Sequence, residues 1–213
     1  MIQEKLVKII IVALVIILAL VIGAYSLQKR IEELEQTITA RDQEINQLEE
    51  ANTILREIVG DIYEVEETAL RVNRNINRDQ AREIARKIVG ASRKYEIPLQ
   101  LAVYTAWAES DFHWRVSGPC GERSMVQVMR RTFYGMRPNG DYNDLDQVFD
   151  AGMHYLRVCW QRAQERAGGN FLVAMAYYNA GSGWPPDVAL RRASIHVRRV
   201  QGIMTKDERM RAA

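Results

Sequence analysis

One carboxylate in this chain of 213 residues has the surroundings of an acid–base catalyst. Glu109 ends the apolar stretch LQLAVYTAWAES and directly follows Trp107 and Ala108. Burial beside apolar side chains removes water from a carboxylate, which raises its pKa and keeps it protonated near neutral pH. Such a group can protonate the leaving oxygen of a glycosidic bond. A glutamate at a helix end can equally cap a loop amide or pair with an arginine, and Glu109 alone does not decide between these interpretations.

The other acidic residues near Glu109 offer it no obvious partner. Hydrolysing glycosidases generally use two carboxylates about 5–10 Å apart. Asp111 is two residues from Glu109 and would point elsewhere on a continuing helix. Asp141, Asp144 and Asp146 lie in a stretch with the glycine and asparagine content of a surface loop. The sequence therefore predicts that one carboxylate, that of Glu109, serves both steps of the reaction.

Three short motifs follow Glu109-Ser110 at separations typical of loops and helices. They are SGPCGERSMVQVM at 117–129, Asn143 followed by AGMHYL at 151–156, and AYYNAGSG at 176–183. Each motif is weak alone, but the ordered set resembles the lytic transglycosylases that carry a soluble-lytic-transglycosylase (SLT, goose-lysozyme-like) domain. The resemblance covers about residues 79–201.

The resemblance implies a lysozyme-like domain that cleaves peptidoglycan between N-acetylmuramic acid and N-acetylglucosamine, leaving 1,6-anhydromuramyl ends. It implies that Glu109 is the acid and then the base, and that the phenol of Tyr178 hydrogen-bonds near its carboxylate. It also implies a set of substrate-binding residues, namely Ser117, Gln127, Met129, Tyr178 and Asn179. No cofactor is implied, and the three histidines lack the spacing of metal ligands. Two alternatives stay open: a goose-type lysozyme that uses water as the nucleophile, and a non-catalytic peptidoglycan-binding scaffold in a membrane or phage assembly.

Several positions depart from the family pattern. Ser124 replaces a glycine, Glu122 an alanine, Val126 a methionine and Arg130 a proline. Because glycine permits close approach of the backbone, Ser124 is expected to narrow the cleft or to add a contact to the sugar. His196 takes the place of a tyrosine in the closing helix of the family and is assigned no catalytic role.

The carboxy-terminal part of the chain is expected to be all-α. The pattern predicts helices over 79–95, from Pro98 to Ser110, and over 125–132, 144–166 and 171–178, and no stretch alternates as a strand does. Pro98 suits the first position of a helix, where its missing N–H would be unpaired anyway. We therefore expect one lysozyme-like domain over 78–205 and a short tail over 206–213.

The amino-terminal part is expected to anchor the chain in a membrane. Residues 9–25 read IIIVALVIILALVIGAY and carry no charge, and Ser26-Leu27 extend the stretch. At about 1.5 Å per residue it is roughly 28 Å long, close to the thickness of a bilayer core. It is longer than the apolar region of a signal peptide, which has about 7–15 residues. We expect a cytoplasmic segment over 1–8 and a transmembrane helix over 9–27 in a bacterial inner membrane, or in a virion or host membrane if the chain is phage-encoded.

Charge counts on the two sides of the apolar stretch are balanced, so they do not set its orientation. The substrate does, because peptidoglycan requires the carboxy-terminal domain to lie in the periplasm.

Residues 28–77 are expected to form a coiled-coil stalk. Apolar residues step by four and three from Leu27 to Ile62, with isoleucine or valine at a and mostly leucine at d, and only Arg41 and Asn52 interrupt the seam. This choice of residues favours a parallel two-stranded coiled coil. The sequence thus predicts a stalk that forms a homodimer, although a single amphipathic helix packed on the following domain is an alternative.

Charge and cysteine content narrow the range of partners. Residues 1–77 carry 8 Lys and Arg against 13 Asp and Glu, whereas residues 78–213 carry 21 against 14. A basic domain on an acidic stalk suits an anionic polymer. The arginines are scattered and no short nucleic-acid motif occurs, so we expect no nucleic acid as partner. Cys120 and Cys159 can form one bridge in an oxidising compartment or remain separate thiols.

Overall fold

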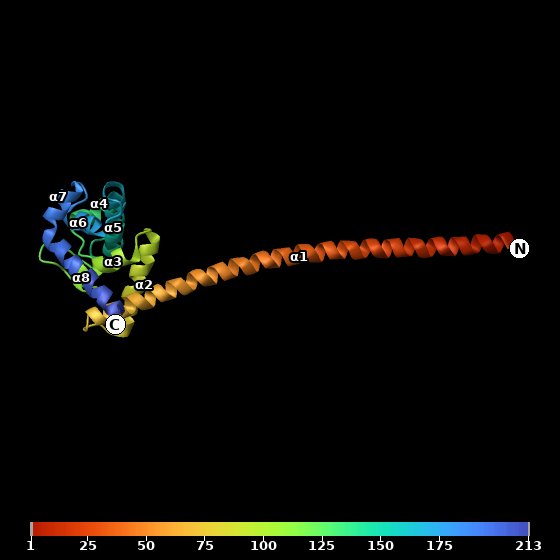
Figure 1. Ribbon diagram of the computed structural model, residues 1–213, viewed down its shortest axis with the longest axis horizontal. Coiled ribbons are helices and arrows are strands. Elements are labelled where there is room, and N and C mark those ends of the chain that lie inside the picture. Colours follow the sequence, from red (N-terminus) through yellow and green to blue (C-terminus); the bar gives the residue numbers. More distant parts are fainter. Residues whose placement is uncertain (1, 213) are drawn as a thin grey trace. The chain divides into compact units, whose positions relative to one another are not determined.

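A computed structural model describes residues 2–212, with side chains from 10 to 210. Met1 and Ala213, at the outer ends of the predicted segments 1–8 and 206–213, lie outside the described residues. Within residues 2–212 the structure has helices and two isolated bridges but no strand, which confirms the all-α prediction. In chain order the helices in Figure 1 are α1 Ile2–Val72, α2 Arg78–Lys94, α3 Leu99–Ser110, α4 Arg130–Met136, α5 Leu145–Ala167, α6 Phe171–Ala180, α7 Pro186–Arg192 and α8 Ser194–Ala212.

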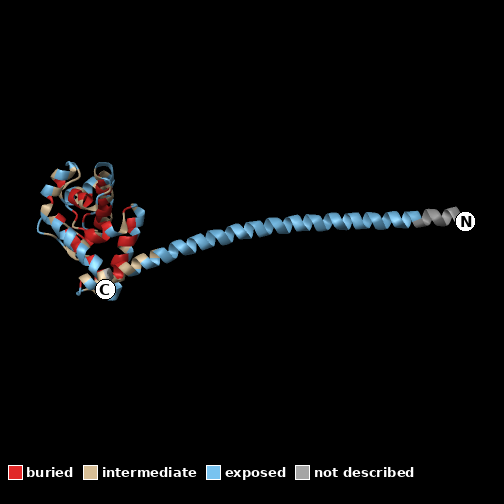
Figure 2. Cartoon of the chain, in the orientation of Figure 1, coloured by how far each residue is buried: buried red, intermediate tan, exposed pale blue. Residues whose placement is uncertain are grey.

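The chain divides into two compact units between Glu57 and Ile58. The first unit is a single helix, the part of α1 up to Glu57, and its described side chains are exposed along its whole length (Figure 2). Its apolar stretch near the amino terminus has a mean hydropathy of 3.0 and is long and apolar enough to cross a membrane. The apolar seam that follows is exposed as well, with Ile45 at 52% and Leu48 at 63%.

The second unit begins with the last turns of α1, which contribute to its core. Val65 and Ala69 are buried there, and the buried carboxylate of Glu66 accepts hydrogen bonds from Arg78 and Arg82 at 3.1 and 3.0 Å. These ion pairs join the end of α1 to the start of α2. The last turns of α1, from Ile58 on, are therefore part of the helical domain.

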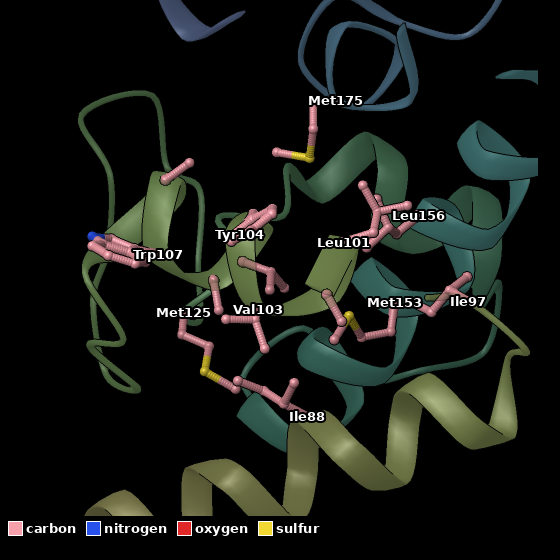
Figure 3. Close-up of a cluster of buried hydrophobic side chains, with 14 of the residues drawn as sticks. Ile88, Ile97, Leu101, Val103, Tyr104, Trp107, Met125, Met153, Leu156 and Met175 are labelled. Carbon is pink, nitrogen blue, oxygen red and sulfur yellow. The ribbon is translucent and has the colours of Figure 1, made fainter. Parts of the chain in front are cut away.

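Helix α3 forms the centre of the second unit. Its residues from Leu101 to Ala108 are all buried, as is typical of a helix that is apolar on every side. Figure 3 shows side chains of α2, α5 and α6 and of the loop before α4 gathered around those of α3, among them Ile88, Met125, Met153 and Met175. Because α3 is enclosed in this way, the position of its carboxy-terminal end is fixed by packing.

The helices of the second unit pack against α3 and against one another. Helix α3 packs against α2 and α8, while α6 packs against α5, α7 and α8, and α4 packs against α5. The helices predicted over 79–95, 144–166 and 171–178 are confirmed as α2, α5 and α6. Pro98 is the residue before α3 rather than its first residue, with ψ at 133°.

The prediction of a helix over 125–132 is wrong for 125–129 and confirmed for 130–132, which open α4. Before Arg130 the chain makes turns, and the helix α4 starts only at that residue. Ser124 and Gln127 have φ of +68° and +48°, in the left-handed region, and Arg123 pairs with Val128 in an antiparallel bridge. A right-handed helix cannot pass through positive φ values, so the apolar residues of this segment are buried by a loop.

Candidate active site

Glu109 lies in the last turn of α3, where the buried helix meets a pocket. Its side chain is 15% exposed, and burial raises its pKa from 4.5 to about 7. The positive charge of Arg199 opposes this rise and the negative charge of Glu122 adds to it. Near neutral pH the carboxyl group therefore exchanges readily between its protonated and ionised forms, which a group that acts as acid and then as base requires.

The chain turns sharply after Glu109. Asp111 ends the helix in the left-handed conformation, with φ of +52°, and its carboxylate lies 3.4 Å from the guanidinium of Arg199. The hydroxyl of Ser110 donates to the carbonyl of Met125 at 2.8 Å. Ser110 thus ties the end of α3 to the loop 117–129, so that the position of Glu109 and the course of the loop depend on each other.

The loop 117–129 is also held from its other side. Arg123 donates to the side chain of Asn143 at 2.9 Å, which gives the predicted asparagine a structural part in the site. The hydroxyl of Tyr142 lies 2.6 Å from the carbonyl of Val128. These contacts anchor the loop to the segment before α5 and give it a fixed shape without regular secondary structure.

Ser124 does not act on the cleft as the sequence predicted. It is fully buried and does not line the pocket that contains Glu109. Its φ is +68°, a conformation that glycine adopts freely and other residues adopt at a cost. The glycine that the family has at this position is therefore suited to the left-handed backbone, and the serine found here strains the loop without narrowing the cleft.

Close packing against α5 completes the support of the loop. A Cβ atom on Gly152 would lie 2.5 Å from a methyl carbon of Val128 and 2.7 Å from one of Val126. Only glycine lets the helix approach the loop this closely. From α6, the hydroxyl of Tyr178 donates to the carbonyl of Val126 at 2.7 Å. The glycine and the tyrosine of two separate motifs thus both contact Val126.

The phenol of Tyr178 lies beside Glu109 but gives its hydrogen bond to the backbone. Burial, and then the nearby charge of Glu109, raise the pKa of Tyr178 well above 10. The hydroxyl therefore stays protonated and keeps its bond to Val126. Its direct effect is to hold the wall of the pocket next to the carboxyl group.

The pocket at Glu109 has a volume of about 360 Å³ and collects most of the predicted site. Glu109 shares it with four predicted substrate-binding residues and with five others. The four are Gln127, Met129, Tyr178 and Asn179, and the others are Cys120, Glu122, Val128, Thr132 and Tyr155. Segments that are far apart in the chain, α3, the loop, α5 and α6, are brought together here. The arrangement places hydrogen-bonding groups around one carboxyl group of raised pKa.

Ser117 lies elsewhere. It is exposed and lines a second hollow of about 650 Å³, together with Gln80, Lys87 and Trp114. Within the loop, Ser117 pairs with Arg123 in an antiparallel bridge. The structure does not place Ser117 against the carboxyl group.

The sequence analysis missed a second carboxylate in the pocket. Glu122 was interpreted only as a departure from the family pattern, yet it lines the same pocket as Glu109 and raises the pKa of that residue. One of its oxygens accepts a hydrogen bond from the backbone of Cys120 at 2.9 Å. Thirteen positions separate the two glutamates, and no periodic pattern marks residues that a loop brings together.

The carboxylates that were considered as partners have structural tasks instead. Asp144 caps the amino terminus of α5, Asp146 pairs with Lys87, and Asp141 accepts a hydrogen bond from the backbone of Asn143.

The two cysteines are both free thiols in the structure, Cys120 exposed and Cys159 buried.

His196 is the other residue that the sequence analysis left without a role. It lies on α8, and its Nε2 is 3.6 Å from Oε1 of Glu109. Burial, and then the charge of Arg199, lower its pKa to about 4. The imidazole is therefore neutral near pH 7. Its position could be anticipated from the family tyrosine that it replaces, but its contact with Glu109 depends on how α8 packs against α3.

Comparison with known families gives one match. The model of the transglycosylase SLT domain matches residues 86–187. This range contains Glu109, the loop 117–129 and the tyrosine and asparagine of the pocket, and it ends before α8. No curated protein and no solved structure matches the chain.

Proposed function

Residues 86–187 form a transglycosylase SLT domain, and from this premise we propose that the chain is a membrane-anchored lytic transglycosylase that cleaves peptidoglycan. The observation that carries the proposal is the state of Glu109. It is a buried carboxyl group with a pKa of about 7 in a pocket lined by Gln127, Tyr178 and Asn179. Such a group can both release and accept a proton at the same pH.

The proposed reaction uses Glu109 twice. The protonated carboxyl group first gives its proton to the oxygen between N-acetylmuramic acid and N-acetylglucosamine, and the bond from C1 to that oxygen breaks. The acetamido group of the muramyl residue stabilises the positive charge that develops at C1. The carboxylate of Glu109 then takes the proton of the muramyl 6-hydroxyl, whose oxygen bonds to C1. The product is a 1,6-anhydromuramyl end, and Glu109 is again protonated.

The position of Glu122 supports one alternative function, a goose-type lysozyme that hydrolyses the same bond with water. A hydrolase needs a second carboxylate that activates water on the opposite face of the sugar, and Glu122 lines the same pocket. We favour the transglycosylase because one oxygen of Glu122 is already bonded to the backbone of Cys120 and because of the family match. In a hydrolase Glu122 would be indispensable, whereas in the proposed reaction it only adjusts the pKa of Glu109.

Analysis of the products distinguishes the two reactions. The full chain in detergent micelles is incubated with isolated peptidoglycan, and the fragments are examined by mass spectrometry. Ends of the 1,6-anhydromuramyl type support the proposal, whereas reducing ends show a hydrolase. Glu109→Gln should abolish release of fragments. The matched control is Asp187→Asn, which removes one negative charge from a side chain that is 65% exposed. If neither the chain nor the control variant releases fragments, the scaffold alternative is correct.

We further propose that the apolar stretch of α1 spans the inner membrane and that the helix after it forms a parallel dimer. The support is the exposed apolar surface described above, which the described residues leave uncovered. In a parallel coiled coil the two copies of an a position face each other. With Cys120 changed to serine, Ile45→Cys should therefore give a disulfide-linked dimer on mild oxidation. Glu50→Cys, which lies at an outward f position, should not, and equal linkage of both would contradict the dimer.

A further inference from the structure

The closest charged or titratable side chain to Glu109 on the facing helix is His196. The two side chains are 10% and 15% exposed, and their nearest atoms, Nε2 and Oε1, are 3.6 Å apart. The family match ends at residue 187, so His196 lies outside the segment that identifies the domain. It is a group at the site that the match does not assign.

Nε2 of His196 is buried and, among the described residues, has no hydrogen-bond partner. A buried polar atom without a partner is costly and needs an explanation. The ring is held in place because α8 packs against α3 and because Val197 and Val200 of α8 are buried. A histidine fixed with its free nitrogen towards a carboxyl group has the geometry of a partner for that group.

The charged and titratable groups around this pair come from four segments. Arg199 lies on α8 and pairs with Asp111 at the end of α3. Glu122 belongs to the loop, and Tyr178 lies on α6, where the charge of Glu109 raises the pKa of its phenol. Arg199 lowers the pKa of the glutamate and of the histidine alike, after burial has raised the first and lowered the second. Between about pH 4 and pH 7 the pair therefore holds one acidic proton, and that proton is on the carboxyl group.

We propose that His196 is a positioning residue for Glu109, whose Nε2–H donates a hydrogen bond to Oε1 and thereby directs the reactive proton to Oε2. While Glu109 is protonated, this bond keeps the acidic proton on the oxygen that faces the substrate. After the proton has left, the same bond stabilises the carboxylate until Oε2 accepts the proton of the 6-hydroxyl. The histidine remains neutral throughout. The separation of 3.6 Å shortens when substrate is bound, as catalytic hydrogen bonds commonly do.

The role assigned to His196 in turnover rests on the proposed transglycosylase function, but its bond to Glu109 does not. The first test therefore needs no substrate. NMR spectra are recorded of the full chain labelled with ¹⁵N in detergent micelles. The signals of the ring nitrogens of His196 are identified because they disappear in His196→Gln. We expect the Nε2–H tautomer and a ring that stays neutral down to about pH 5. A proton on Nδ1, or protonation near pH 6.5, would overturn the proposal whatever reaction the protein catalyses.

The second test measures turnover of peptidoglycan. His196→Leu should lower kcat about 10- to 100-fold with little change in KM, the usual effect of losing a supporting partner of a reactive group. In the pH profile of the activity of this variant, the alkaline limb should move to higher pH by about one unit, because the carboxylate of Glu109 loses a hydrogen bond. His196→Gln, whose amide can donate the same bond, should restore most of the rate. His154→Gln is the control, since His154 is exposed on α5 and stacks on Tyr95.

Folding of the variants is checked by tryptophan fluorescence, and His196→Phe replaces His196→Leu if the latter does not fold. If the role of His196 were purely structural, His196→Gln and the apolar variant would lower the rate to the same extent, and neither would shift the pH profile of the activity. That result would refute the proposal while the 1,6-anhydromuramyl products of the unmodified chain still supported the transglycosylase.

Discussion

Replacing Glu109 by glutamine should abolish activity and stabilise the folded domain at neutral and alkaline pH. The reason is the raised pKa of the carboxyl group, which means that the folded protein resists its ionisation. With a pKa of 4.5 when unfolded and about 7 when folded, the contribution of Glu109 to stability is fully present below pH 4.5. It is lost between pH 4.5 and 7 as the unfolded chain releases the proton first. The neutral amide of the variant does not undergo this loss.

The size of the effect follows from the two pKa values. One pKa unit corresponds to about 1.4 kcal/mol, so the full difference from 4.5 to about 7 amounts to about 3 kcal/mol. The carboxyl group is largely buried, so solvent screens this energy little. Below pH 4.5 the unmodified chain has a neutral carboxylic acid at position 109 and the variant has a neutral amide, so a difference in their free energies of unfolding there reflects packing alone. As the pH rises above 4.5, the variant should become more stable relative to the unmodified chain, and this gain should reach its limit beyond pH 7.

Urea unfolding followed by tryptophan fluorescence measures this difference. All 4 tryptophans of the chain lie in the second unit, so the signal reports on that unit and not on the long helix. Both proteins are unfolded at several values between pH 4 and pH 8.5. The control Asp187→Asn removes a charge from an exposed side chain of α7. A stability difference between Glu109→Gln and the unmodified chain that stays constant over this pH range would show that the pKa of Glu109 is not raised.

Four further substitutions test the loop and the charges around the carboxyl group. Ser124→Gly should stabilise the second unit by about 1 kcal/mol in urea unfolding, because it relieves a left-handed backbone. Gly152→Ala should destabilise it by about 1–3 kcal/mol in the same assay, because the added methyl group overlaps the loop. Glu122→Ala removes a negative charge that raises the pKa of Glu109, so the alkaline limb of kcat/KM should move to lower pH. Arg199→Gln should move the same limb to higher pH, and movement of both in one direction would contradict the assigned charges.

Helices α2, α3, α5 and α6 were predictable from sequence because each has a local signature. The apolar stretch of α3 occurs in a helix that is buried on every side. Glu109 could be identified from its position at the end of that stretch, and Gln127, Tyr178 and Asn179 through their motifs. In these cases a short stretch of sequence is enough to predict the helix or to identify the site residue.

The loop was not predictable in the same way. Its segment SMVQVM has the composition of a short helix, and two residues at positive φ together with one bridge prevent it from forming. Nothing in the residue types of Ser124 and Gln127 requires those dihedral angles, which are imposed by the hydrogen bonds of the loop with Ser110, Tyr142 and Asn143. Glu122 reaches the pocket through this same conformation. Its place beside Glu109 therefore depends on tertiary contacts that no local pattern encodes.

The pKa of Glu109 shows that α8 belongs to the site. Burial in the end of α3 raises it, and Glu122 of the loop raises it further, while Arg199 of α8 lowers it. A carboxyl group that must donate a proton and then accept one works best with a pKa near the ambient pH. Burial and Glu122 both favour the protonated form, and the arginine offsets part of their effect. Because Arg199 and His196 both lie beyond the segment that matches the family, a chain ending at residue 187 would keep the motifs and lose two of the groups that set the chemistry of their central residue.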